Sequence, residues 1–218
     1  MRSSIASANA RSSTLNARAL VVGRALGYRC CTVELRKTGE RKWGVASMEA
    51  SVALEEDIRR LAEQERLLVF PRFGPEDAWA LGNIVREAAL AQGAPIAVDV
   101  SLRDRALFHC ALPGSTTDNA EWIRRKRNTV LRLWRSSYAV GRSLALSGRT
   151  QEAAHALPLA DYAVHGGSFP LLLQGTGCIG AITVSGLPQR DDHTLVSDAL
   201  AAFLKVDLST CRLGAERA

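Results

Sequence analysis

The segment with the clearest capacity for chemistry is VHGGSFP, at residues 164–170. Two consecutive glycines, Gly166 and Gly167, follow the imidazole of His165, so backbone N–H groups and a titratable ring can approach a bound group closely. His165 could then ligate a metal or act as an acid or base. A second interpretation is structural, namely a histidine at the entrance of a strand whose backbone needs glycine. The sequence leaves both open.

Two further stretches carry polar groups that could serve a ligand. Asp192 and His193 lie at the predicted start of a helix, where capping accounts for the aspartate, and a structural role is favoured for the histidine. The run WIRRKR at residues 122–127 concentrates four cations on another predicted helix. These cations suit an anionic ligand or an acidic patch of a partner, and the alternative is a solvated charged face.

Several familiar signatures are missing from the sequence. It has no GxxxxGK[ST] phosphate loop, no HExxH and no GxSxG. Its five cysteines form no CxxC pair and no Cys/His cluster with metal spacing, so we expect no metal site. The run Gly175-Thr176-Gly177 joins two predicted strands and opens no helix, which indicates a turn.

The positive charge of the chain is confined to its N-terminal part. The net charge is +6, but residues 1–47 alone carry seven Arg and two Lys against Glu34 and Glu40. Residues 48–218 are therefore almost neutral, and we expect no nucleic-acid partner. No apolar run is long enough for a membrane span, and the scattered cysteines suit the reducing cytoplasm.

We expect residues 1–47 to be a basic, disordered leader and residues 48–218 to form a single domain. The favoured explanation of the leader is an early start codon, with Met48 as the working initiator. The alternatives are an organellar transit peptide, because the segment is rich in Arg and Ser, and a functional arm.

Hydrophobic periodicity predicts an alternation of helices and strands. We expect helices over about residues 50–66, 75–92 and 118–146 and from 191 onward, and strands over 67–70, 96–102, 105–112, 169–174 and 178–185. Two short turns make neighbouring strands antiparallel, so the fold is α/β of the α+β kind, with a mainly antiparallel sheet of about five strands covered by helices. If Arg103-Asp104 forms a two-residue hairpin, His109 falls on the same face as Val98.

Four stretches of the chain resemble one known family. The residues HGGSFP, then GCIGAITVSGLP, then DDH, together with Trp122, Arg124, Arg125 and Lys126, are similar to the GlcG/HbpS family of haem-degrading-domain proteins, in a branch that carries a WxRRK helix. The resemblance covers about residues 50–206. It implies a profilin-like sandwich and a symmetric homo-oligomer, and by extension haem as the cofactor.

The favoured function is that of an oligomeric protein that binds haem or another small planar or anionic ligand. The alternative is a non-catalytic oligomeric adaptor that binds other proteins, and haem degradation is implied by the resemblance alone. The residues expected near the ligand are His165, Gly166, Gly167, Trp122, Arg125, Lys126, Ser185, Gly186, Asp192 and His193.

Overall fold

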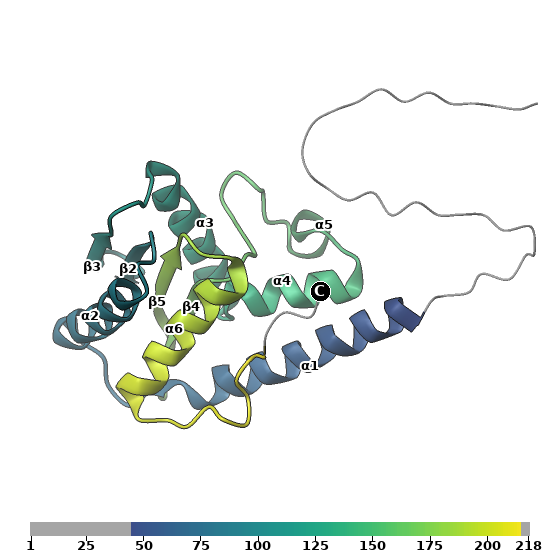
Figure 1. Ribbon diagram of the computed structural model, residues 1–218, viewed down its shortest axis with the longest axis horizontal. Coiled ribbons are helices and arrows are strands. Elements are labelled where there is room, and N and C mark those ends of the chain that lie inside the picture. The colour runs from purple at the N-terminus through teal and green to yellow at the C-terminus, as the bar shows by residue number, and fades with distance from the viewer. Residues whose placement is uncertain (1–44, 215–218) are drawn as a thin grey trace, which may run out of the picture. The chain divides into compact units, whose positions relative to one another are not determined.

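The computed structural model describes residues 45–214, and within them six helices and five strands (Figure 1). The leader expected at residues 1–47 lies almost wholly outside this range. The elements are α1 (Val45–Leu67), β1 (Val69–Phe70), α2 (Pro75–Ala91), β2 (Ala97–Leu102), β3 (Ala106–Ala111), α3 (Thr117–Leu133), α4 (Ser137–Ser147), α5 (Gln151–His155), β4 (Ser168–Leu173), β5 (Gly177–Ser185) and α6 (Gln189–Leu204).

The five strands form one sheet in the order β1-β4-β5-β2-β3. Strand β1 is parallel to β4, and the β4–β5, β5–β2 and β2–β3 pairs are antiparallel. The predicted α+β sandwich with a mainly antiparallel sheet is therefore confirmed. No helix within residues 45–214 is both long and apolar enough to cross a membrane.

The two faces of the sheet differ in chemistry. Helices α2 and α6 cover one face, and α3 covers the other (Figure 1). The face under α2 and α6 is apolar and contributes Val98, Val100, Phe169, Leu171, Ile182 and Val184 to the main core. On the α3 side, Ser168 and Thr183 share a hydrogen bond of 2.7 Å between their hydroxyls. There Ser101 also donates to Asp99, at 2.6 Å.

The single helix expected over residues 118–146 is two helices. Trp134 ends α3 in the left-handed region, with φ of 58°, and Ser136 starts α4 by accepting a hydrogen bond from the N–H of Ala139. A Cβ on Gly177 would lie 2.7 Å from the Trp134 ring, so the indole packs directly on the start of β5. The helical periodicity continued through this break, and for that reason the sequence did not reveal it.

The predicted face of His109 is wrong, because the register between β2 and β3 is shifted by one residue. Asp99 lies opposite His109, and a β-bulge interrupts the β2–β3 register where Val100 faces Phe108 and Ser101 faces Ala106. One extra residue on β3, Leu107, moves every later side chain to the other face of the sheet. His109 therefore shares a face with Asp99, 3.7 Å away, and not with Val98.

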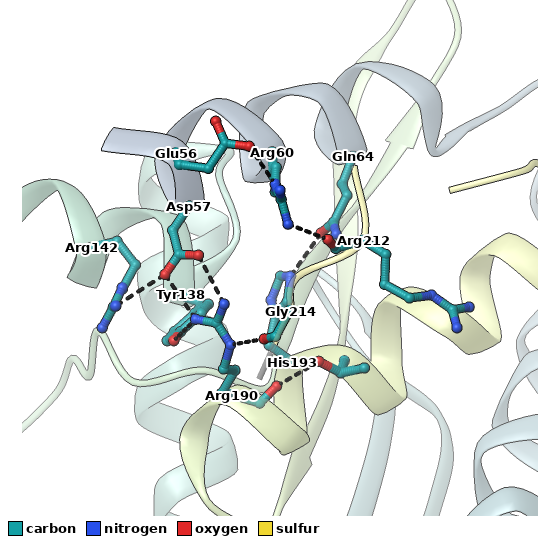
Figure 2. A network of polar contacts seen from close by, with 11 residues as sticks. Glu56, Asp57, Arg60, Gln64, Tyr138, Arg142, Arg190, His193, Arg212 and Gly214 are labelled. Atoms are coloured by element: carbon teal, nitrogen blue, oxygen red, sulfur yellow. Dashed lines mark hydrogen bonds and ion pairs between the residues drawn. The ribbon is translucent and has the colours of Figure 1, made fainter. Parts of the chain in front are cut away.

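A buried polar network fixes α1 and the C-terminal segment to the rest of the domain (Figure 2). The guanidinium of Arg190, in α6, donates two hydrogen bonds of 2.8 and 2.9 Å to the Asp57 carboxylate in α1. Arg190 also donates to the Tyr138 hydroxyl and to the carbonyl of Gly214, and Arg142 lies 3.0 Å from Asp57. Burial alone would raise the pKa of Asp57, but the two arginines outweigh it and the pKa lies below its usual value.

We predict that Asp57→Asn destabilises the domain by about 3 kcal/mol or more, because it removes the negative charge shared by the buried guanidinium of Arg190 and the partly buried one of Arg142. Urea unfolding at pH 7 measures the change. Glu56→Gln is the matched control, since Glu56 is the preceding residue and its pairs with Arg59 and Arg60 are on the surface. Equal stability of the two variants would contradict this role for Asp57.

Candidate functional site

A cavity of about 240 Å³ lies where the first turns of α3, the loop after β5 and the start of α6 meet His165. Six of the ten residues singled out from the sequence line it, namely Trp122, Lys126, His165, Ser185, Gly186 and Asp192. The other four lining residues are Asp118, Asn119, Leu187 and Gln189.

Two aromatic rings and a cation form the rim of this cavity. The His165 imidazole and the Trp122 indole meet edge to face, with centroids 4.9 Å apart and planes at 77°. The guanidinium carbon of Arg125 lies 4.2 Å from the centroid of the same indole, and the indole N–H donates to Asp118 at 2.9 Å. These contacts fix the orientation of the indole beside the histidine.

The imidazole of His165 is held in its neutral form. Partial burial lowers its pKa below the ordinary value of 6.5, and the positive charges of Lys126 and Arg125 lower it further. A neutral imidazole keeps one nitrogen lone pair free to accept a proton or to bind a metal centre. The rim therefore offers an accepting nitrogen next to a flat aromatic surface at neutral pH.

A buried ion pair forms one wall of the cavity. The ammonium of Lys126 donates to Asp192, at 2.8 Å, and to the carbonyl of Val184, at 3.0 Å, and the Lys126 residue is only 3% exposed. The second carboxylate oxygen of Asp192 accepts from the N–H of Leu187, at 3.0 Å. Burial lowers the pKa of Lys126 and raises that of Asp192, while their mutual attraction opposes both shifts. Lys126 is thus committed to Asp192 and is not available as the cation for a bound anion.

The two glycines after His165 serve packing inside the domain. A Cβ on Gly167 would lie 2.9 Å from both the Lys126 ammonium and the Cβ of Asp192, and the residue has φ of 113°. A Cβ on Gly166 would collide with the carbonyl of Gln189 at the start of α6. Neither glycine lines the cavity. Gly167 allows the turn to approach the ion pair, and Gly166 allows it to approach the start of α6, so of the two interpretations that the sequence left open these contacts fit the structural one.

His193 points away from the cavity, toward α1 and α4. It is 1% exposed, and its ring lies next to the rings of Tyr138 and Phe169. Its Nε2 donates to the Gln64 amide oxygen, at 2.9 Å, while the amide nitrogen of Gln64 donates to the carbonyl of Cys211. Within the described residues its Nδ1 has no hydrogen-bond partner. Successive helical residues point about 100° apart, so Asp192 and His193 could not both face one cavity.

The sequence missed the lining residues in the first turn of α3. Asp118, Trp122 and Lys126 are spaced by four residues, so they share one helical face, and Asn119 lies beside them. Asn119 also caps the helix, because its side-chain oxygen accepts from the N–H of Thr116 at 2.7 Å. Extending the face of Trp122 backward by one turn would have identified Asp118.

Comparison with known proteins shows the family to which this chain belongs. The model of a family described as haem degrading protein, HbpS-like, matches residues 73–201. A UPF0303 protein of Rhizobium leguminosarum bv. trifolii is 54% identical over 162 residues, which cover 74% of this chain and 98% of that protein. A UPF0303 protein of Edwardsiella ictaluri is 52% identical over 153 residues, which cover 70% of this chain and 98% of that protein.

Solved structures show the same fold. The crystal structure of the Ybr137w protein has a TM-score of 0.66 and 29% identity, and the match covers 72% of this chain and 95% of that one. PduOC, solved as a haem complex, has a TM-score of 0.52 and 17% identity, and the match covers 60% of this chain and 94% of that one. At this identity the second match shows a similar fold alone.

We predict that Lys126→Met destabilises the domain by about 3–5 kcal/mol, because the Asp192 carboxylate is left buried without its cation. The double variant Lys126→Met/Asp192→Leu should lose clearly less than the sum of the two single changes, since it removes both charges. Urea unfolding of the three variants measures the coupling. Arg125→Met, one residue earlier on α3 and only partly buried, is the control. Additive losses would contradict the buried pair.

His193 should make the stability of the domain depend on pH. Burial, assisted by the charge of Arg190, lowers its pKa from 6.5 to about 3. Below pH 6.5 the unfolded chain binds a proton at this residue that the folded chain does not bind. The free energy of unfolding should therefore fall as the pH is lowered, by up to about 1.4 kcal/mol per pH unit from this group.

Urea unfolding between pH 7 and pH 4.5 tests this dependence. His193→Gln should flatten the fall, whatever its effect on stability at pH 7, and His155→Gln, at an exposed position of α5, should leave the slope unchanged. The same slope in His193→Gln as in the wild type would assign the pH dependence to other groups.

Proposed function

This chain belongs to the HbpS-like family of haem-degrading proteins, and from that premise we propose that it binds haem, or a planar anionic ligand of similar shape, at the cavity beside His165. The observation that carries the proposal is the neutral imidazole of His165 next to the Trp122 indole. Histidine is a common axial ligand of haem iron, and an aromatic ring can pack against a flat macrocycle. PduOC, which has a similar fold, binds haem in its solved structure.

The residues around the cavity fit one edge of a haem. The cavity, at about 240 Å³, is smaller than the roughly 300–1,000 Å³ of pockets that enclose a whole ligand, so most of a macrocycle would lie outside it. His165 is the residue we assign to the iron, and Arg125 is the cation that can meet a propionate, since Lys126 is paired with Asp192. When bound, haem would supply an iron centre with a free coordination position.

Each residue of this site would have a distinct task. His165 offers its lone pair at neutral pH, Trp122 holds the imidazole by edge-to-face contact, and Asp118 fixes the indole through its N–H. The Lys126–Asp192 pair keeps the wall rigid without taking part in binding. The proposed activity is binding, and we place it in the cytoplasm, where the free thiols of Cys178 and Cys211 stay reduced.

We predict that the full chain binds haem saturably, with a Soret band that shifts on binding. His165→Ala should weaken binding at least tenfold and change the position of the band, because it removes the nitrogen that would bind the iron. His155→Ala removes an exposed histidine outside the cavity and should bind as the wild type does. Absorbance titration against a fixed protein concentration measures all three.

Unchanged affinity and an unchanged spectrum in His165→Ala would remove His165 from the site. No saturable binding by the wild type would overturn the haem proposal and turn attention to the adaptor function.

A further inference from the structure

Strand β3 leaves one long edge of the sheet open. It is the last strand in the order β1-β4-β5-β2-β3, and Figure 1 shows no element beyond it. Its residues 106–111, ALFHCA, contain no charged side chain and no proline. Natural edge strands usually carry such residues to prevent pairing with another chain, so an uncharged edge of six residues is open to a partner strand.

The ladder between β2 and β3 defines which backbone groups face outward. The N–H of Leu112 donates to the carbonyl of Ile96, so it points toward β2. Because the direction of the backbone N–H and C=O groups alternates along a strand, those of Cys110 and Phe108 also point toward β2. The N–H and C=O groups of His109 and Ala111 therefore point away from the sheet.

This outward-facing segment is symmetric about Cys110. The bulge at Leu107 ends the regular ladder three residues before Cys110, and Pro113, which has no N–H, ends it three residues after. His109 and Ala111 lie one residue to either side. Two identical strands can satisfy all four of their outward groups in one antiparallel register, in which His109 of each copy faces Ala111 of the other.

We propose that β3 is the contact between two copies of this chain, joined antiparallel about a two-fold axis at Cys110 into one continuous ten-stranded sheet. The paired residues exchange four backbone hydrogen bonds across the axis. A two-fold contact of this kind is closed, because each copy uses the same surface, so no β3 edge stays open, and the two-residue strand β1 lies at both ends of the paired sheet.

Helix α2 supplies apolar surface beside this edge. Trp79 is 59% exposed, and its ring meets the Phe108 ring at a centroid distance of 5.5 Å. Leu90, near the other end of the helix, is 44% exposed. In the paired sheet Phe108 faces Leu112 of the second copy, so Trp79 would be covered by the second copy. Aromatic residues of this kind are enriched at the core of interfaces.

Oxidative cross-linking of the full chain tests the register directly. Opposed residues that share no hydrogen bond in an antiparallel ladder have Cα atoms about 4.5 Å apart, within the range of a disulfide. Diamide should therefore join the two Cys110 thiols, taking up their two electrons and two protons. A covalent dimer should form in the wild type and be lost in Cys110→Ser.

Moving the thiol by one residue provides the matched control. In Cys110→Ser/Ala111→Cys the two thiols belong to residues about two positions out of register, with Cα atoms beyond about 7 Å, so no covalent dimer should form. Equal cross-linking of this variant and the wild type would overturn the register at Cys110.

Two further variants test the edge without any thiol. Ala111→Pro removes an N–H that points away from β2, and His109→Lys places like charges near the axis, while circular dichroism confirms that both still fold. Each should lower the mass measured by light scattering to that of species lacking this contact. A monomeric wild type at tens of micromolar, or an unchanged mass in both folded variants, would overturn the proposal.

The outcome is independent of haem binding. None of the residues that line the cavity at His165 belongs to β3. Loss of the dimer with retained haem binding, or the reverse, therefore separates the two proposals.

Discussion

The buried pair of Lys126 and Asp192 is the interaction on which the candidate site depends. A charge taken out of water is stable in the fold only when it is paired and hydrogen-bonded, so this pair needs the surrounding elements in place. Helix α3 supplies the lysine and α6 the aspartate, while the end of β5 supplies the carbonyl of Val184. The turn before β4 must then pass without a side chain at Gly167. The shape of the cavity follows from this convergence.

The start of α6 is held from both sides. Asp192 faces the cavity, while Arg190 and His193 face α1 and α4 through Asp57, Gln64 and Tyr138. Figure 2 shows how the Arg190 guanidinium also reaches the carbonyl of Gly214, so the last described residues close over the same region. One turn of helix thus carries the wall of the cavity and the anchor of helix α1, which accounts for the number of buried polar residues within it.

The sequence predicted the fold where local periodicity and tertiary structure agree. Alternation located β2 and the apolar runs located β4 and β5, because these strands pack one face on the main core. The prediction failed where the conformation of a single residue determines the structure around it. The bulge at Leu107 inverted the face of His109, and the left-handed Trp134 divided one long helix into two. Neither leucine nor tryptophan predicts such a conformation from its type, since the contacts that stabilise it come from distant parts of the chain.

The same limit applies to the site. Six of the ten residues chosen from the sequence meet around one cavity, because they come from strand ends and helix starts that the sheet brings together. The sequence favours a structural role for His193 while also counting it among the ligand residues, and the structure places it against α1, because neighbouring helical residues point about 100° apart. Gly166 and Gly167 were expected near a ligand, but Gly167 accommodates an ion pair inside the protein and Gly166 accommodates the backbone of Gln189. The sequence could not predict this structural role, because it does not show where the Lys126 side chain lies.

The unequal faces of the sheet impose different rules on sequence change. Under α2 and α6 a substitution succeeds when it conserves volume, because dispersion and burial have no direction. Under α3 the contacts of Asp99, Ser101, Ser168 and Thr183 are directional, so a replacement must reproduce donors and acceptors in place. The cavity opens on this second side. The wall that Lys126 and Asp192 form is likewise set by directional contacts, whereas the apolar core tolerates replacements that conserve volume.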